Sequence, residues 1–351
     1  MAARGAAQPG TGSAGARPVA SNLPLAPRCT VAIPAFNRAD MIRGTLESVL
    51  QQDLRGLEII LIDDQSTEPV IEIAASYADP RLKIFRNDRN LGLFGNFSRC
   101  VELAKGTFIR ILCNDDRLTP QCLRREVEVM EANPDVSLLF SRGLRVRTDG
   151  KPMGMIGNHF PEGIYERHTA VAVVLWFLAH YGINPVTLPS GVLLRRSACQ
   201  RAGRFDESMR MNGDLDYFLR VLEWGNLGVL DAVGCQIAIH ENQVSASMLG
   251  DVVTLREDFL LADRHRELLT AAGTYAGIVR FLAAFTSLVG LQLLAGRRLA
   301  EAQEHARLAL SRCPNRAVLA FTAVQVLMLR FLLKHARIRR VPAKPHPFAG
   351  K

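Results

Sequence analysis

Ile109–Asp116 reads Ile-Arg-Ile-Leu-Cys-Asn-Asp-Asp, an apolar β-strand that ends abruptly in acidic residues. Adjacent carboxylates repel each other and are costly to desolvate. A divalent cation such as Mg²⁺ or Mn²⁺ offsets that repulsion by binding to the carboxylate oxygens. Ligands of open α/β sheets also bind at the carboxyl ends of strands. The stretch therefore predicts a cation site, against the alternative of a solvated turn that caps the next helix.

Short apolar runs and amphipathic segments alternate on either side of this stretch. We expect strands at 29–35, 57–62, 81–85, 107–112 and 136–140, and helices at 39–52, 70–77, 95–104 and 120–132. Such alternation indicates an α/β fold with a doubly wound, mostly parallel sheet flanked by helices. After residue 141 the pattern weakens, and helices at 168–180 and 214–223 are expected around a strand near 191–194.

The basic charge of the chain is confined to its two ends. The formal net charge is +9 over 351 residues, but 1–28 and 330–351 together carry ten Lys and Arg residues and no acid. The body is therefore close to neutral. A nucleic-acid-binding protein is disfavoured, because the body has no basic excess and the tails lack interleaved aromatic residues.

Four segments are expected along the chain. Residues 1–28 are rich in Ala, Gly, Pro and Ser and lack an apolar core, which predicts a disordered tail and not a signal peptide. Residues 29–250 would form the α/β domain. Helical periodicity over 251–337, with breaks near Gly296 and Pro314, predicts a helical C-terminal region, followed by a basic tail over 338–351.

The cysteines argue for a reducing environment. There are seven, scattered and odd in number, and none forms a C-x-x-C pair. Neither a disulfide framework nor a zinc site is indicated, and a cytoplasmic location is expected.

Polar motifs follow three other predicted strands at the same edge of the sheet. The first strand ends at Pro34, and the helix after it is expected to be capped by Asn37 or Asp40. The second ends in Asp63-Asp64, where one acid can hold loop amides and the other can accept a hydrogen bond from a base. The third leads into 86–92, where a glycine permits close backbone approach.

The order V-A-I-P-A-F-N-R, E-I-I-L-I-D-D-Q-S-T, R-N-x-x-N-L-G and I-L-C-N-D-D resembles the family 2 inverting glycosyltransferases of the GT-A fold, over about residues 29–245. The resemblance implies a metal-dependent transfer from a nucleotide-sugar, usually UDP-linked, with Mn²⁺ or Mg²⁺ as cofactor. It also implies a nucleotide-sugar half at 29–141 and an acceptor half at 142–250. The residues implied to contact the donor are Pro34, Ala35, Phe36, Arg38, Asp63, Asp64, Asn90, Gly92, Asn114 and Asp115, with Asp116 as the main metal ligand.

The same resemblance implies a catalytic base. The stretch 211–220, M-N-G-D-L-D-Y-F-L-R, is similar to the family's acidic motif at the head of a helix, which makes Asp214 the base and Asp216 structural. The alternative is that Asp214 only caps that helix. His240 matches a late His that reaches the metal or the diphosphate in relatives, although a lone His is more often structural. Ser190 is assigned to the acceptor side.

Two residues depart from the family pattern. Gln65 stands where glycine is commoner, and Asn114 stands where many relatives have Asp, which gives a weaker oxygen ligand and one less negative charge. Asn114 therefore keeps open a catalytically silent, nucleotide-binding relative.

The C-terminal region is informative about the kind of acceptor. Its apolar runs, 280–296 and 317–333, are shorter than the roughly 20 residues of a membrane-spanning helix. They favour either a helical hairpin packed on the α/β domain or peripheral attachment to the inner face of the plasma membrane through the basic tail. The Q-x-x-R-W pattern of processive synthases is absent, so we expect single transfers. By family analogy the acceptor is a cell-surface glycan or a lipid-linked saccharide, and transfer to a polyprenyl phosphate is the alternative.

Overall fold

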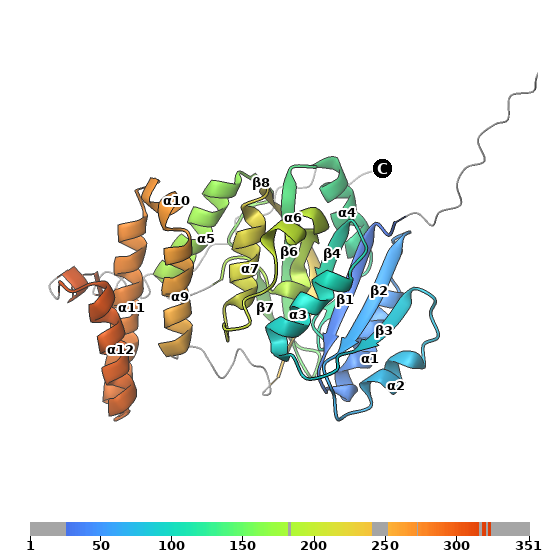
Figure 1. The fold of residues 1–351 in the computed structure, drawn as a ribbon, viewed down its shortest axis with the longest axis horizontal. Coiled ribbons are helices and arrows are strands. Elements are labelled where there is room, and N and C mark those ends of the chain that lie inside the picture. Colours follow the sequence, from blue (N-terminus) through green and yellow to red (C-terminus); the bar gives the residue numbers. More distant parts are fainter. Residues whose placement is uncertain are drawn as a thin grey trace, which may run out of the picture.

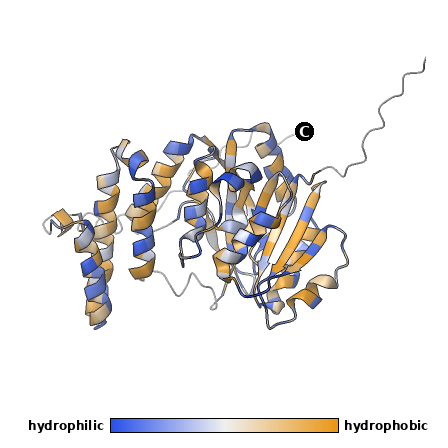
Figure 2. Ribbon diagram, in the orientation of Figure 1, coloured by the Kyte–Doolittle hydropathy of each residue, from blue (hydrophilic) through white to orange (hydrophobic). Residues whose placement is uncertain are grey.

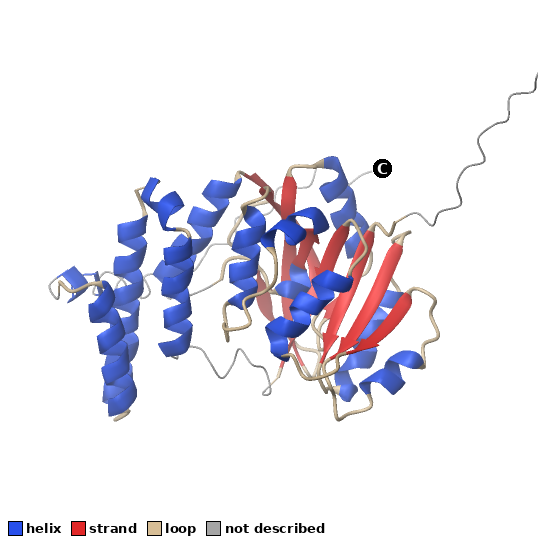
Figure 3. Cartoon of the chain, viewed as in Figure 1, coloured by secondary structure: helices blue, strands red, loops and turns tan. Residues whose placement is uncertain are grey.

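The structure, a computed structural model, describes residues 26–181, 184–240, 252–271, 273–315, 318–320 and 322–323. A ten-stranded sheet lies at the centre with helices on both of its faces, and the C-terminal helices stand to one side of it (Figures 1 and 3). Most of the predicted N-terminal tail, the predicted boundary near residue 250 and the basic tail 338–351 lie outside the described residues.

The first half of the sheet is parallel. Its strands run in the order β3-β2-β1-β4, with every neighbouring pair parallel. Because parallel strands point the same way, their carboxyl ends gather at one edge, and Ala35 is paired with Asp63 and Asp63 with Arg86. The elements are β1 (Cys29–Ala35), α1 (Ala39–Leu50), β2 (Leu57–Asp63), α2 (Val70–Ala75), β3 (Leu82–Arg86), α3 (Gly92–Leu103) and β4 (Phe108–Ile111).

The second half of the sheet is mixed. Strand β9 lies antiparallel between β4 and β6, and β10 runs parallel to β6. The predicted α/β class is therefore confirmed, with parallel pairing concentrated in the first half. Strands β5, β7, β8 and β10 were not predicted. The elements are β5 (Arg117–Leu118), α4 (Cys122–Ala132), β6 (Val136–Arg147), β7 (Pro152–Ile156), β8 (Gly163–Tyr165), α5 (Arg167–Tyr181), η1 (Pro189–Gly191), β9 (Val192–Arg195), α6 (Arg196–Ala202), α7 (Gly213–Leu222) and β10 (Asn226–Ile239).

Each face of the sheet has its own hydrophobic core, and the central strands are strongly hydrophobic (Figure 2). Helices α1 and α4 cover one face with residues such as Leu46 and Leu123. Helices α3 and α7 cover the other, where Phe205 stacks on Tyr217 at a ring-centroid distance of 3.8 Å. All seven cysteines are free thiols, as their spacing predicted.

The C-terminal region is helical as predicted, with α9 (Val252–Arg264), α10 (Arg266–Ala271), α11 (Tyr275–Ala295) and α12 (Leu299–Arg312). The breaks also agree, because Gly296 is the C-cap of α11 and α12 ends just before Pro314. Helix α11 packs on α5, α9 and α12. By length and composition α11 could cross a membrane, although 39% of its most apolar stretch is buried. Most of the second apolar run, 317–333, lies outside the described residues.

Candidate active site

The loop after β1 is fastened to the loop after β2. Both Asn37 and Arg38 adopt left-handed backbone conformations, with φ of 57° and 65°. The side-chain oxygen of Asn37 accepts a hydrogen bond from Thr67 N at 2.9 Å, and Asn37 N donates to Ser66 Oγ at 2.7 Å. The predicted cap was wrong, since Arg38 is the N-cap of α1 and makes no side-chain capping hydrogen bond, while Glu68 Oε2 accepts from Ala39 N at 2.6 Å. Asn37 instead links the two loops.

Asp64 holds the third loop. Its carboxylate accepts hydrogen bonds from Asn87 Nδ2 at 2.7 Å, Leu91 N at 2.8 Å and Gly92 N at 3.0 Å. The Asn90 amide in turn donates to Asp64 O at 3.0 Å. Gly92 has φ of +75°, which explains why a glycine ends this loop. Asp64 is therefore the acid that holds loop amides.

Asp63 has a different set of partners. It accepts from Ser66 N at 3.2 Å and lies 3.3 Å from Arg86 Nε, with its side chain only 1% exposed. Of the first loop, Pro34 and Ala35 complete β1, and Phe36 is 50% exposed beside them. The residues predicted for the nucleotide therefore share one edge of the sheet.

The acidic motif after β4 meets the end of β10. Arg38 forms an ion pair with Asp115, and His240 Nε2 lies 3.0 Å from Asp115 Oδ2. Asp116 is nearly buried, and Ala238 N donates to its Oδ1 at 2.9 Å. Residues more than a hundred positions apart thus surround the two acids that the sequence assigned to the cation.

These acids fit a divalent cation. The ligand atoms of Cys113, Asp115 and Asp116 all lie within 4.8 Å of one another. Burial, followed by the charge of Asp115, raises the pKa of Asp116 to about 8. A bound cation would remove that penalty, because its charge favours the ionised carboxylates. His240, beside Asp115, offers a further nitrogen ligand.

The side chain of Asn114, which departs from the family pattern, has a structural role. Its amide Nδ2 donates to Asn37 O at 3.1 Å, and the side chain is buried. An aspartate at this position could not donate that hydrogen bond. The amide therefore connects the acidic motif to the loop after β1.

Asp214 lies in the first turn of α7 and is partly buried. It is not the helix cap, because Asn212 occupies that position, and Asp214 Oδ1 accepts from Leu215 N at 2.7 Å. Burial, with a contribution from the charge of Glu257, raises the pKa of Asp214 to about 6. Burial, followed by the charges of Asp116, Asp115 and Asp214, raises the pKa of the Cys113 thiol well above its ordinary value, so Asp214 lies near the acidic motif.

Two neighbours of Asp214 fix its position. Gly213 packs directly on α3, where an added Cβ would lie 2.6 Å from the ring of Phe94. Asp216 is fully buried and forms ion pairs with Arg220 at 2.8 Å and with Arg264. The side chain two residues beyond the predicted base is thus a structural anchor.

Ser190 contacts the acidic motif. Its hydroxyl donates to Asp116 Oδ2 at 2.5 Å and accepts from Cys113 N at 3.1 Å. Its carbonyl accepts from Arg110 Nη1 at 2.6 Å, and Arg110 also pairs with Glu126 in the interior. Sequence reasoning missed this support, although a charged Arg110 inside an apolar strand signals a buried partner.

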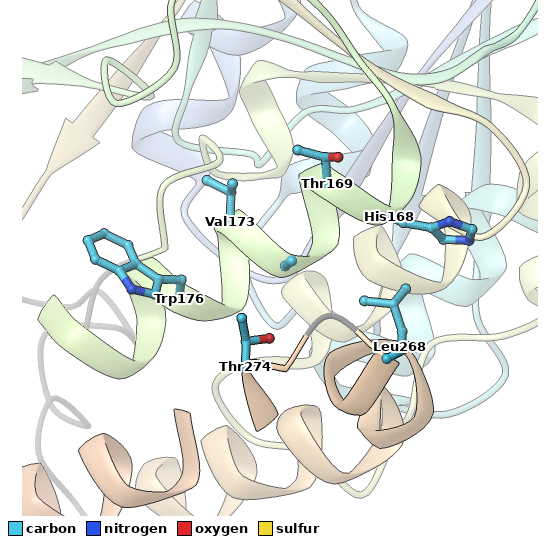
Figure 4. A pocket seen from close by; sticks show the side chains of 8 residues that line it. His168, Thr169, Val173, Trp176, Leu268 and Thr274 are labelled. Atoms are coloured by element: carbon cyan, nitrogen blue, oxygen red, sulfur yellow. The ribbon is translucent and has the colours of Figure 1, made fainter. Parts of the chain in front are cut away.

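A separate cavity of about 550 Å³ lies between α5 and the helices α10 and α11 (Figure 4). None of the predicted site residues contributes to its lining, which is mostly apolar. The lining residues are His168, Thr169, Ala172, Val173, Trp176, Leu268, Ala271 and Thr274.

Comparison with known proteins finds a family that matches part of the chain. Residues 30–172 match the family described as Glycosyl transferase family 2. The succinoglycan biosynthesis protein ExoO of Rhizobium meliloti is 32% identical over 133 residues, which is 36% of this chain and 38% of that protein. The chain spans between 38% and 65% of the length of the first curated relatives that it matches.

Solved structures agree on the fold. The chain is similar to S. aureus TarS 1–349 in complex with UDP-GlcNAc, with a TM-score of 0.61 and 15% identity over 88% of this chain and 91% of that chain. It is also similar to the mannosyltransferase PcManGT from Pyrobaculum calidifontis in complex with GDP-Man and Mn²⁺, with a TM-score of 0.51 and 17% identity over 86% of this chain and 87% of that one. Both support the GT-A type of sheet and flanking helices.

Proposed function

We propose that the chain is an inverting glycosyltransferase of family 2 that moves a sugar from a UDP-linked donor to an acceptor hydroxyl, since residues 30–172 match that family. One observation carries the proposal most strongly. Segments far apart in the sequence meet at the predicted cation ligands, because Arg38 and His240 both contact Asp115 and Ala238 N donates to Asp116 Oδ1 at 2.9 Å. This convergence supports a cation site at the edge of the sheet where we expect the nucleotide to bind.

The donor nucleotide would bind where the three loops meet. We assign its contacts to Asp63, to the loop after β1 and to the loop that Asp64 holds. Arg38 and Arg86, both partly exposed at this edge, supply positive charge for the phosphates. The assigned residues are Pro34, Ala35, Phe36, Arg38, Asp63, Asp64, Asn90, Gly92, Asn114 and Asp115.

Asp116 and His240 would hold the cation, Mn²⁺ or Mg²⁺, with Asp115 beside them. When bound, it stabilises the negative charge that develops on the departing nucleoside diphosphate. Asp115 is already held by Arg38 and His240, so its carboxylate is oriented before a ligand arrives. Ser190 and Ala238 orient Asp116 in the same way.

Asp214 would act as the base. Its carboxylate takes the proton of the acceptor hydroxyl while that oxygen forms a bond to the anomeric carbon. The bond from that carbon to the diphosphate oxygen breaks in the same displacement, so the configuration inverts. A pKa of about 6 leaves Asp214 mostly ionised at neutral pH and still basic enough to accept the proton.

The first test is nucleotide release from a panel of UDP-, GDP- and dTDP-sugars by the purified chain, with Mn²⁺ or Mg²⁺ and with a chelator. We expect slow, metal-dependent release of UDP that is lost in Asp116→Ala. Release that is insensitive to chelator would overturn the metal assignment, and release of another nucleotide would overturn the choice of donor. No release and no nucleotide binding would favour the catalytically silent relative.

The identity of the acceptor distinguishes transfer to a saccharide from transfer to a polyprenyl phosphate. A polysaccharide or lipid-linked saccharide acceptor suits the similarity to a succinoglycan biosynthesis protein, and its neutral hydroxyl needs a base. A polyprenyl phosphate is already ionised and needs none. Asp214→Asn should therefore abolish transfer to a sugar acceptor, whereas undiminished transfer to a polyprenyl phosphate would favour the alternative.

We also propose peripheral membrane contact through the turn between α11 and α12. Leu291, Leu294 and Leu299 are 60%, 50% and 59% exposed there, next to Arg297 and Arg298. Exposed leucines beside arginines suit an anionic bilayer surface. Flotation with phosphatidylglycerol vesicles should recover the chain, and Leu291→Glu with Leu294→Glu should abolish recovery. Equal recovery of both proteins would contradict this contact.

A further inference from the structure

Helix α9 holds the loop that leads to Asp214. Glu257 of α9 is 6% exposed, and its Oε1 accepts from Arg210 N at 2.6 Å. Its Oε2 accepts from Met211 N at 3.0 Å and from Asn212 N at 2.8 Å. One carboxylate therefore binds three consecutive backbone amides, and the third belongs to the N-cap of α7. Asp214 follows two residues later.

The residue next to Glu257 adds a second hold on the same loop. Asp258 Oδ1 accepts from Asn212 Nδ2 at 2.7 Å, and Asp258 is 3% exposed. The cap residue of α7 is thus bound through its main chain by Glu257 and through its side chain by Asp258.

Helix α9 also contacts the other side of Asp214. Arg264 forms ion pairs with Asp216, two residues after Asp214, and with Asp206, which lies before the loop. Buried, charged hydrogen bonds of this kind are stronger than neutral ones and fix geometry. The turn that carries Asp214 is consequently held from both directions by a helix outside the α/β sheet.

We propose that Glu257 is a positioning residue for the base Asp214, so that the helical C-terminal region completes the catalytic site. This inference rests on the proposed function. Without the Glu257 carboxylate, three amides of 210–212 lose their acceptor and the first turn of α7 shifts. A displacement of about 1 Å at a reacting group can lower a rate about a hundredfold.

The test uses the full chain and the donor sugar that the nucleotide-release panel identifies. Glu257→Gln keeps the size of the side chain but replaces one acceptor oxygen with a donor. We expect kcat to fall about tenfold to a hundredfold, with the Kd for the nucleoside diphosphate and Mn²⁺ changed less than about twofold, because the hydrogen bonds of Glu257 go to 210–212 and not to the donor loops. Glu257→Asp keeps the carboxylate and should recover part of kcat.

A matched control is the adjacent Arg256→Ala. It breaks an exposed ion pair between Arg256 of α9 and Glu304 of α12, and this pair involves none of 210–212. This variant should keep wild-type kcat. If both variants lose kcat equally, α9 is merely disturbed and the inference is wrong.

A double variant distinguishes positioning from general stability. If Glu257 acts through Asp214, adding Glu257→Gln to Asp214→Asn should lower kcat little further. If the losses of kcat from the two single variants multiply in the double variant, the inference is wrong. It is also wrong if Glu257→Gln leaves kcat unchanged and only lowers the melting temperature. A wild-type chain that releases no nucleotide removes the proposed function and this inference together, whereas an active wild type with unimpaired Glu257→Gln removes the inference alone.

Discussion

The hydroxyl of Ser190 donates a hydrogen bond of 2.5 Å to Oδ2 of Asp116. The two residues are 74 positions apart in the sequence. They meet because Ser190 lies in η1, which leads directly into β9, and β9 pairs antiparallel with β4, the strand that precedes Asp116. Ser190 also accepts from Cys113 N, so one buried side chain orders both the strand end and the acid that we assign to the cation.

Ser190→Ala should weaken metal binding. Asp116 loses a donor that lowers its pKa, so protons compete better with the cation. Loss of such outer contacts typically lowers metal affinity about 10–100-fold. The measurement is the Mn²⁺ concentration that gives half-maximal UDP binding.

The control for that variant is Ser137→Ala. Ser137 is equally buried, and among the described residues its hydroxyl has no hydrogen-bond partner. This change should leave the Mn²⁺ requirement unaltered. Equal behaviour of the two alanine variants would show that Ser190 does not support the cation site.

The rate of nucleotide release should depend on the ionisation of Asp214. A base must be deprotonated to act, so activity should rise with pH through about 6 and fall tenfold per unit below it. The charge of Asp214 interacts with Glu257 of α9 and with the Cys113 thiol after β4. Because the charge of Glu257 helps to raise this pKa, Glu257→Gln should move the acidic limb to lower pH.

Asp214→Asn should remove that limb and lower the rate about 10²–10⁴-fold. Asp149→Asn, at an exposed turn between β6 and β7, is the reference and should retain the wild-type profile. An acidic limb that persists in Asp214→Asn would assign the titration to another group.

Glu126→Gln should destabilise the whole domain. Arg110 and Glu126 are 0% and 1% exposed, and removing one charge leaves the other buried without its partner. Such losses cost about 3–5 kcal/mol, measured as the free energy of unfolding in urea. Replacing both, as in Arg110→Met with Glu126→Leu, should recover much of the loss.

An exposed ion pair between Arg124 of α4 and Asp53, which follows α1, supplies the comparison. Arg124 and Asp53 are 44% and 42% exposed, so Arg124→Gln should cost about 0–1 kcal/mol. If Glu126→Gln costs no more than this, the interior pair does not contribute to stability as its burial indicates.

Gly213→Ala should disturb the start of α7. The new Cβ would lie 2.6 Å from the Phe94 ring, and overpacking of this kind costs about 1–3 kcal/mol. Phe94→Leu in the same chain should relieve part of that cost. Gly277→Ala, in open space within α11, should instead stabilise its helix by about 1 kcal/mol. A destabilisation common to both would contradict a steric cause.

The parallel half of the fold was predictable because its signals are local. Each strand from β1 to β4 is a short apolar run followed by polar residues, and Asp63, Asp64 and Asp116 all follow such runs. Strand β10 was missed because Gly228, Gly234 and polar residues interrupt its apolar pattern, and because its pairing with β6 shifts register three times. Its end nevertheless brings His240 to Asp115.

The supporting contacts were not predictable from the sequence. Glu257 lies in a segment with ordinary helical periodicity, and its partners are 45 to 47 residues away. Ser190 and Asn114 are small polar residues whose partners depend on how the strands are ordered. Residue type and spacing identify which groups can do chemistry, whereas the groups that orient them depend on the tertiary structure.

The hydrogen bonds around Asp64 also affect the thermodynamics of nucleotide binding. Since that carboxylate already accepts from Asn87, Leu91 and Gly92, the loop loses its conformational entropy when the chain folds. Ligand binding then requires little further loss of conformational entropy from the loop, so more of the free energy of the contacts contributes to affinity. A donor that does not fit the loop gains no binding energy by rearranging it. A rigid loop of this kind therefore selects nucleotides by their shape.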